Sequence, residues 1–239
     1  MSRAISTLFA QIGMTESVAA LWALMVRYYR EKGFDAAAYI LFDRGRLGQA
    51  VAILEYGFPP EVMETYAELG YGQHDAVLRV AMSTGRPERR SRIIERFKLS
   101  RDEIWHREAM QALGVGEVLG LPLFGPHGRD ALGALAGARH HHVFEAANLT
   151  ELHMAAQAAH LRAFALRPMP GQELDGLSLR EVEILRLIAQ GKSNSVIAVI
   201  LGIAPGTVDT YLRRIFDKLG VADRTSAAVK GVSLGLIRA

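Results

Sequence analysis

Hydrogen-bonding side chains recur between residues 205 and 219, among apolar positions. They are Thr207, Asp209, Thr210, Arg213, Arg214 and Asp217. Guanidinium and hydroxyl groups donate to phosphates and to base edges, and a carboxylate accepts from the exocyclic amine of cytosine. If one element presented these groups together, they would form a surface suited to a nucleic acid.

A helix over residues 205–219 would present them together, opposite a buried stripe. The stripe consists of apolar residues at helical spacing: Val208, Leu212, Ile215 and Leu219. Pro205 is tolerated in a first helical turn, and the short segment Gly202–Ala204 separates this helix from the apolar run Val196–Leu201. The pattern predicts a helix-turn-helix, whose second helix enters the major groove of DNA. A plain three-helix packing unit is the alternative.

Two further helices flank this pair. Ser178 and Glu181 have the spacing of a capping box before an apolar helix that ends at Gly191. Ser193 or Asn194 can cap the next helix. Asp223 would cap a closing helix, whose inward positions are predicted to be Ala227, Ala228, Val232 and Leu236. The end of the chain is therefore expected to be an all-α, four-helix domain.

Residues 177–237 resemble the carboxy-terminal DNA-binding domain of LuxR-type regulators. The matching strings are LSLREVEILRL, IAQGKSNSVIAVIL, TVDTYL, IFDKL and DRTSAA. The resemblance implies DNA binding, and we assign its contacts to Lys192, Asn194, Thr207, Asp209, Thr210, Arg213 and Arg214. The position of Asp209 is usually basic in that family. Because phosphates repel a carboxylate, we expect Asp209 to face a base and the target sequence to be unusual.

The distribution of charge agrees with this assignment. The chain has 239 residues, 50% hydrophobic and 22% charged, as expected for an ordered protein of one or two domains. Residues 175–239 carry 9 basic and 6 acidic side chains, whereas residues 1–174 carry 19 of each. All the excess positive charge therefore lies at the DNA-binding end.

Several classes of protein are disfavoured. The chain has no cysteine, which excludes disulfides and thiolate metal sites. The apolar run Val18–Val26 is too short to span a bilayer and lacks the features of a signal peptide, so we expect a soluble cytoplasmic protein without a membrane partner. Nucleophile–base motifs, phosphate loops and paired zinc-ligand spacings are missing, so we expect no enzyme, no catalytic residue and no cofactor. Adjacent His140–His142 are interpreted as a solvated turn rather than a metal site.

The first two thirds of the chain predict an α+β domain, a sheet with helices on its faces. Predicted strands are 37–42, 49–55, 118–124 and 131–138, and predicted helices are 15–32, 60–68, 76–83, 100–113 and 144–166. Thr15 is a candidate cap for the first helix. Residues 167–174 contain two prolines and a glycine and are interpreted as a linker. The expected domains are thus 1–166 and 175–239.

The predicted layout of residues 5–165 is similar to the autoinducer-binding domain of quorum-sensing receptors of the LuxR type. The stretch TYAELGYGQHDAVLR has the family's nine-residue spacing between a tyrosine, Tyr66, and an aspartate, Asp75. The resemblance implies that Asp75 accepts a hydrogen bond from a ligand amide and that Tyr66 donates to an acyl carbonyl. From the residues alone, Asp75 is equally a helix N-cap. The two roles are compatible, because one carboxylate accepts several donors.

The family's two tryptophans are replaced. Val62 stands where an indole donates to the lactone carbonyl, and Arg90 stands where another tryptophan forms a pocket wall. A site without the buried donor loses much of its discrimination for a lactone. Arg90 either pairs with a carboxylate or enolate of another ligand or points into solvent beside its basic neighbours. Phe58 and Trp105, with Ile104, Leu121 and Phe124, are candidate pocket walls or ordinary core.

Together these features predict a LuxR-type regulator with a ligand sensor and a DNA reader. We expect a small amphiphilic signal, which need not be an acyl-homoserine lactone, to stabilise a homodimer that reads a two-fold-symmetric operator. In the alternative, the regulator is independent of ligand and its first domain serves dimerisation or protein interaction. A third hypothesis, an enzyme domain fused to a DNA reader, lacks catalytic motifs.

Overall fold

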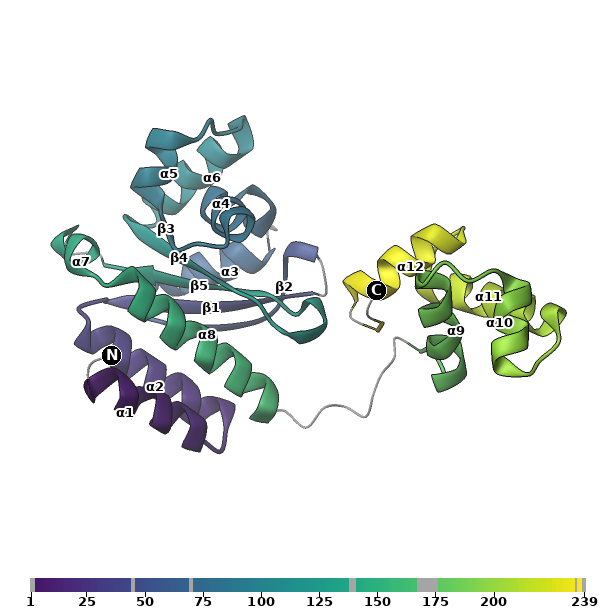
Figure 1. Ribbon diagram of the computed structural model, residues 1–239. Coiled ribbons are helices and arrows are strands. Elements are labelled where there is room, and N and C mark those ends of the chain that lie inside the picture. Colours follow the sequence, from purple (N-terminus) through teal and green to yellow (C-terminus); the bar gives the residue numbers. More distant parts are fainter. Residues whose placement is uncertain are drawn as a thin grey trace. The chain divides into compact units, whose positions relative to one another are not determined.

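The computed structural model describes residues 3–43, 46–68, 71–137, 141–166, 176–234 and 236–237. They form two compact units (Figure 1): the first is built from Met1–Gly125 and Arg129–Pro168, and the second contains Met169–Ala239. The first unit is a sheet covered by helices and the second is helical, so the predicted fold classes are confirmed.

The first unit is organised around a five-stranded antiparallel sheet of order β2-β1-β5-β4-β3. The strands are β1 (Ala36–Asp43), β2 (Arg46–Tyr56), β3 (Glu88–Arg89), β4 (Val118–Leu123) and β5 (Ala131–Ala136). The two predicted hairpins are confirmed as the pairs β1–β2 and β4–β5. The short strand β3 at the edge was not predicted, since two residues carry no periodicity.

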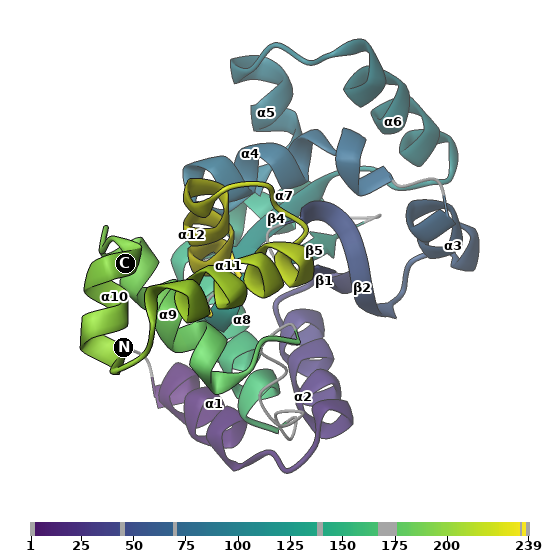
Figure 2. The ribbon, with the colours of Figure 1, turned by 90° about the vertical axis from the view of Figure 1, so that its right-hand side faces the viewer.

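Helices cover both faces of this sheet (Figures 1 and 2). One face carries α1 (Arg3–Met14), α2 (Val18–Glu31) and α8 (Leu149–Leu166), and the other carries α3 (Pro60–Glu68), α4 (Ala76–Thr84) and α6 (Arg101–Ala112). In β1, Ala37 and Leu41 belong to the first core, whereas Ile40 and Phe42 belong to the second. Alternation along each strand therefore supplies two separate hydrophobic cores.

Some local predictions were wrong. Helices α1 and α5 (Arg90–Arg96) were not predicted, and Ser17, not Thr15, caps α2 by accepting from the amide of Ala20. The predicted helix 144–166 is two helices, because Asn148 accepts from the amide of Glu151 and starts α8 anew. The predicted turn at His141 and His142 is instead the start of α7 (His141–Ala146). His140 and the predicted linker, residues 167–174, lie outside the described residues.

The second unit is a helical bundle with its own core. Its helices are α9 (Leu179–Ala189), α10 (Asn194–Leu201), α11 (Pro205–Leu219) and α12 (Arg224–Ser233). The predicted capping box of Ser178 and Glu181 is formed, Ser193 caps α10, and Asp223 caps α12. Helices α10 and α11 differ in direction by 107°, which is the geometry of a helix-turn-helix.

The turn depends on a glycine in the left-handed region. Gly202 ends α10 with φ of 63°, and Pro205 occupies the first turn of α11. The stripe predicted on α11 is confirmed, since Val208, Leu212, Ile215 and Leu219 are all buried.

Two predicted inward positions of the closing helix differ in the structure. Leu236 packs against the core but lies after α12, which ends at Ser233. Val232 is 41% exposed, and Gly231 packs inward instead. A Cβ on Gly231 would lie 2.8 Å from Cδ2 of Leu185, so a larger residue here would force the Leu185 side chain to shift.

None of the described helices is by itself long and apolar enough to cross a membrane. Helices α10 and α11 meet that criterion only as a pair, across their bend.

We predict that Gly202→Ala weakens the helix-turn-helix by about 1 kcal/mol, because alanine is strained at positive φ. The matched control is Gly206→Ala, since Gly206 lies in α11 with open space around it and without positive φ. Hydrogen exchange of peptides from α10 and α11 should be about fivefold faster in Gly202→Ala and unchanged or slower in the control. Equal protection in the two variants would contradict the constraint on Gly202.

Candidate functional site

A cavity lies between the sheet and the helices α3, α4 and α6. We call it the sensor cavity; it encloses about 40 Å³. Most of its lining is apolar: Ala38, Ile40, Phe58, Val62, Met63, Val77, Met110, Val115, Val118, Leu132 and Ala134. Four polar side chains complete the wall, namely Tyr66, Asp75, Arg90 and His106. An apolar cavity with a few convergent polar groups is typical of a small-molecule site.

Two of the predicted ligand-reading residues contact each other. The hydroxyl of Tyr66, at the end of α3, donates to Oδ2 of Asp75 across 3.1 Å. The other oxygen of Asp75 accepts from the amide of Val77 at 2.8 Å and caps α4, so the predicted N-cap is present. Burial, and then the charge and hydrogen bond of Asp75, raise the pKa of Tyr66 well above 10. Tyr66 is therefore a neutral donor at physiological pH.

Arg90 points inward, so the solvent-facing alternative was wrong. Its Nη1 donates to the carbonyl of Val115 at 2.8 Å and also to that of Gly116. The two carbonyls hold the guanidinium beside the cavity at the start of α5. Burial lowers the pKa of Arg90, while the negative charge of Asp75 opposes that shift. A cation and a carboxylate thus stand at one end of an otherwise apolar space.

His106 is a cavity residue that the sequence analysis missed. Its buried ring lies edge-on to that of Tyr66, with the ring centroids 6.1 Å apart. Burial lowers the pKa of His106, which favours the neutral imidazole. Glu103, His106 and Met110 form the buried face of α6, and their spacing of three and four residues was the available signal.

Trp105 was wrongly predicted to be a pocket wall. It lies on the other side of α6, 53% exposed, because the residue before an inward-facing histidine is rotated by about 100° around the helix. Ile104 and Phe124 are also exposed, and Leu121 belongs to the core on the opposite face of the sheet. Phe58 and Val62 do line the sensor cavity. Val62 is aliphatic and offers no hydrogen bond there.

In the second unit, the predicted DNA-binding residues lie on one helix and its neighbour. Thr207, Asp209, Thr210, Arg213 and Arg214 are exposed on α11. Lys192 is exposed just before α10, and Asn194 begins α10, half-buried. The hydroxyl of Thr210 donates to the carbonyl of Gly206, so its oxygen remains free to accept. The guanidinium of Arg214 lies over the ring of Tyr211, 5.9 Å from its centroid.

Asp209 is held by a polar network that the sequence analysis did not predict. Nδ2 of Asn194 donates to Oδ1 of Asp209 at 2.7 Å, and Arg224 donates to Oδ1 of Asn194 at 3.3 Å. Arg224 also donates to the carbonyl of Lys192. The network links the starts of α10 and α12 to α11 and orients the Asp209 carboxylate. Arg224 lies in the string DRTSAA, which was the available signal.

No group of three or more His, Cys, Asp or Glu side chains within the described ranges has an arrangement that could hold a metal ion.

Two family models match the chain, one over each unit. Residues 175–230 match the bacterial regulatory proteins of the luxR family, and residues 17–163 match the autoinducer binding domain. The second match covers more than half of the chain. The chain belongs to the LuxR family of regulators. It therefore combines an autoinducer-binding domain with a DNA-binding helix-turn-helix, and it is a transcriptional regulator.

Curated relatives include other LuxR-type proteins. The quorum sensing-dependent transcriptional regulator RpaR of Rhodopseudomonas palustris is 34% identical over 209 residues, which are 86% of this chain and 84% of RpaR. The putative transcriptional regulator y4qH of Sinorhizobium fredii is 31% identical over 182 residues, which are 75% of this chain. The match spans only 55% of y4qH.

Solved structures show the same fold. Escherichia coli SdiA superposes with a TM-score of 0.69 over 98% of both chains, at 17% identity. A structure of SdiA in complex with octanoyl-rac-glycerol gives the same TM-score, over 98% of this chain and 96% of SdiA.

The LuxR-type reader is stabilised by a buried carboxylate. Glu181 completes the capping box of α9 and accepts two hydrogen bonds from Nζ of Lys218 on α11, at 2.7 and 3.0 Å. Burial alone would raise the pKa of Glu181, but the hydrogen bonds from Lys218 and Ser178 outweigh it and lower the pKa. This contact joins α11, the second helix of the helix-turn-helix, to the first helix of the unit.

We predict that Glu181→Gln destabilises the second unit by about 1–2 kcal/mol at pH 7, because the charged hydrogen bonds to Lys218 are lost. The folded-state pKa of Glu181 lies below its ordinary value of 4.5. Its contribution is therefore present above pH 4.5 and is lost as the pH falls through the folded-state pKa. Unfolding measured from pH 7 to pH 3 should show the difference from wild type shrinking in acid.

Glu183→Gln is the matched control, because Glu183 forms an exposed pair with Arg180 on the same helix. It should change stability by less than about 0.5 kcal/mol at every pH. A similar loss in both variants would show that the buried position of Glu181 has no special effect.

Proposed function

We propose that this LuxR-type regulator senses a small amphiphile in the sensor cavity. The contact between Tyr66 and Asp75 carries the proposal, because a donor and an acceptor stand together at the edge of an apolar cavity. A ligand with an amide or hydroxyl and an acyl carbonyl can donate a hydrogen bond to Asp75 and accept one from Tyr66. The apolar lining then surrounds the tail.

The preferred head group is not a lactone. Val62 offers no donor to a lactone carbonyl, while the guanidinium of Arg90 is fixed by the carbonyls of Val115 and Gly116. Only Nη1 of Arg90 is engaged with described residues in these hydrogen bonds, so its other nitrogens can donate to an oxygen-rich or anionic head group. SdiA, which shares the fold, has a complex with octanoyl-rac-glycerol, a molecule without a lactone ring.

Ligand binding has to reshape the cavity. At about 40 Å³ it holds only about three water molecules, whereas ligand sites generally need hundreds of cubic ångströms. An entering ligand would replace the hydrogen bond between Tyr66 and Asp75 and move α3 away from the start of α4. Ligand binding therefore requires a conformational change, and the ligand stabilises the state in which α3 has moved away from the start of α4.

The form of the protein that regulates transcription is, in this proposal, a homodimer. We propose that residues 1–166 form the sensor, 167–174 the linker and 175–239 the reader, and that α8 contributes to the dimer through exposed Met154 and Leu161. Two copies of α11 would read a two-fold-symmetric operator in the cytoplasm. The proposal includes no enzymatic activity.

A second candidate is a regulator that needs no ligand. It is favoured by the small cavity and by the fact that Tyr66 and Asp75 already satisfy each other. In that case the first domain serves dimerisation or binds another protein. The ligand experiment below separates the two candidates.

We predict that octanoyl-glycerol and octanoate stabilise the protein more than octanoyl-homoserine lactone does, since Val62 replaces the lactone-reading indole and Arg90 can donate to an oxygen-rich or anionic head group. Thermal unfolding with each compound reports binding, because a ligand of the native state raises Tm. Asp75→Asn should weaken the binding of octanoyl-glycerol about tenfold while keeping the cap of α4, because asparagine also caps helices. Arg90→Ala should remove the response to octanoate.

Arg92→Ala is the control for charge, since Arg92 forms an exposed pair with Glu95 on the same helix. A strong response to the lactone that survives Asp75→Asn would contradict the ligand class and the role of Asp75. No response to any compound would favour the ligand-independent candidate.

We predict that Arg213→Ala and Arg214→Ala weaken operator binding by about 1–3 kcal/mol wherever the side chain contacts a base. Arg186 is an exposed arginine on α9, so Arg186→Ala should change operator affinity only by the small effect of losing one positive charge. Footprinting and sedimentation would test this together, with a dimer protecting a two-fold-symmetric site. A monomer on an asymmetric site, or unchanged affinity in both α11 variants, would show that the reading surface is elsewhere.

A further inference from the structure

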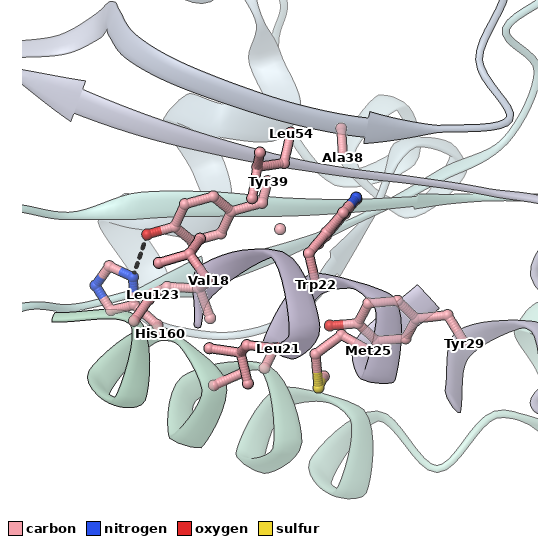
Figure 3. A pocket seen from close by; sticks show the side chains of 14 residues that line it. Val18, Leu21, Trp22, Met25, Tyr29, Ala38, Tyr39, Leu54, Leu123 and His160 are labelled. Carbon is pink, nitrogen blue, oxygen red and sulfur yellow. Dashed lines mark hydrogen bonds between the residues drawn. The ribbon is translucent and has the colours of Figure 1, made fainter. Parts of the chain in front are cut away.

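A second cavity lies on the opposite face of the sheet, between α2, α8 and strands β1, β2, β4 and β5 (Figure 3). We call it the α2–α8 cavity; it encloses about 50 Å³, slightly more than the sensor cavity. Ala38 lines both cavities, so they lie back to back across β1. No predicted ligand-binding residue lies in this second space.

Small side chains keep the space open. Ala156, Ala159 and Ala163 face it from successive turns of α8, and Gly133 faces it from β5. Larger apolar residues at these positions would fill the gap and add packing energy, because an empty cavity in a core is destabilising. Small residues alone do not make a binding site, but the cavity also holds polar groups.

Tyr29 supplies an unused donor. Its side chain is only 6% exposed and lines the cavity, yet its hydroxyl makes no hydrogen bond to the described residues. Figure 3 shows the hydroxyl directed back along α2 toward Met25 and the cavity. Burial raises the pKa of Tyr29, so the hydroxyl keeps its proton. A tyrosine that lies in a core usually has a partner for its hydroxyl, and here a molecule in the cavity can supply one.

The wall of the cavity is uncharged. Tyr39 and Nδ1 of His160 form a hydrogen bond of 2.8 Å across its far end. Burial lowers the pKa of His160 to about 4, so the imidazole is neutral at physiological pH. None of the described lining residues is Asp, Glu, Lys or Arg. The sensor cavity differs, since Asp75 and Arg90 line it.

We propose that the α2–α8 cavity is a second binding site, for a neutral and mainly apolar molecule with one hydrogen-bond acceptor. Tyr29 donates to that acceptor, and the alkyl part lies against Leu21, Met25 and the alanines of α8. A charged head group would lose its hydration without gaining an oppositely charged partner, so the site selects against carboxylates and ammonium ions. Because Ala38 separates the two cavities, a molecule here also touches the back of the sensor cavity.

The two tryptophans of the chain make a direct test possible. Trp22 lines the α2–α8 cavity (Figure 3), and Trp105 is exposed on α6, on the other face of the sheet. In full-length protein carrying Trp105→Phe, Trp22 is the only indole and reports on this site. Fluorescence would be titrated with 1-octanol, octanoate and octylammonium at pH 7.5.

We expect a saturable change in Trp22 emission with 1-octanol, at least about tenfold tighter than with either charged compound. Tyr29→Phe keeps the ring but removes the hydrogen bond, so it should weaken the binding of 1-octanol about fivefold. Ala159→Leu should abolish binding by filling the space. Tyr66→Phe is the matched control in the sensor cavity and should leave the Trp22 titration unchanged.

Three results would overturn the proposal: a linear, non-saturating response, equal affinity for charged and neutral compounds, or a response that Tyr66→Phe removes and Tyr29→Phe leaves intact. The last would place the octanol in the sensor cavity. Tyr29→Phe is nearly isosteric, so it decides the question even if Ala159→Leu does not fold.

Discussion

The burial of one sheet on both faces is the constraint on which the first unit depends. Antiparallel sheets commonly expose one face to water, but here β1, β4 and β5 send side chains into two cores. Helices must therefore cover both faces. At the middle of the sheet, Ala38, Gly133 and Ala134 are too small to fill the space beneath the helices. The two cavities follow from that shortage of side-chain volume.

Polar contacts then give each unit its chemistry. In the first unit, Asp75 caps α4 and accepts from Tyr66, so one carboxylate orders a helix start and marks the polar edge of the sensor cavity. In the second, Glu181 joins α9 to α11 through Lys218, and Asn194 joins α10 to Asp209. Neighbouring donors thus orient the exposed carboxylate of Asp209 on α11.

Periodic patterns were sufficient for most elements. The stripe of α11, the capping box of Ser178 and Glu181, and the two hairpins were predicted because they depend on residues close in sequence. The break at Asn148 and the short elements β3 and α5 were not predicted, since a single cap or a few residues give only a weak signal in the sequence. Trp105 was misplaced because two of the residues on the buried face of α6, Glu103 and His106, are polar and do not resemble core positions.

The sequence by itself determined the class of protein: a dense string of local motifs defines the LuxR-type reader, and the spacing of Tyr66 and Asp75 indicates the sensor. Only the tertiary structure decided where Arg90 points, that His106 joins the sensor cavity, and that the Tyr29 hydroxyl lies beside a second cavity with no hydrogen bond to the described residues. Local motifs are read within a few turns of one helix. The burial and the direction of a side chain depend on segments that are distant in sequence, and local spacing does not predict how those segments pack.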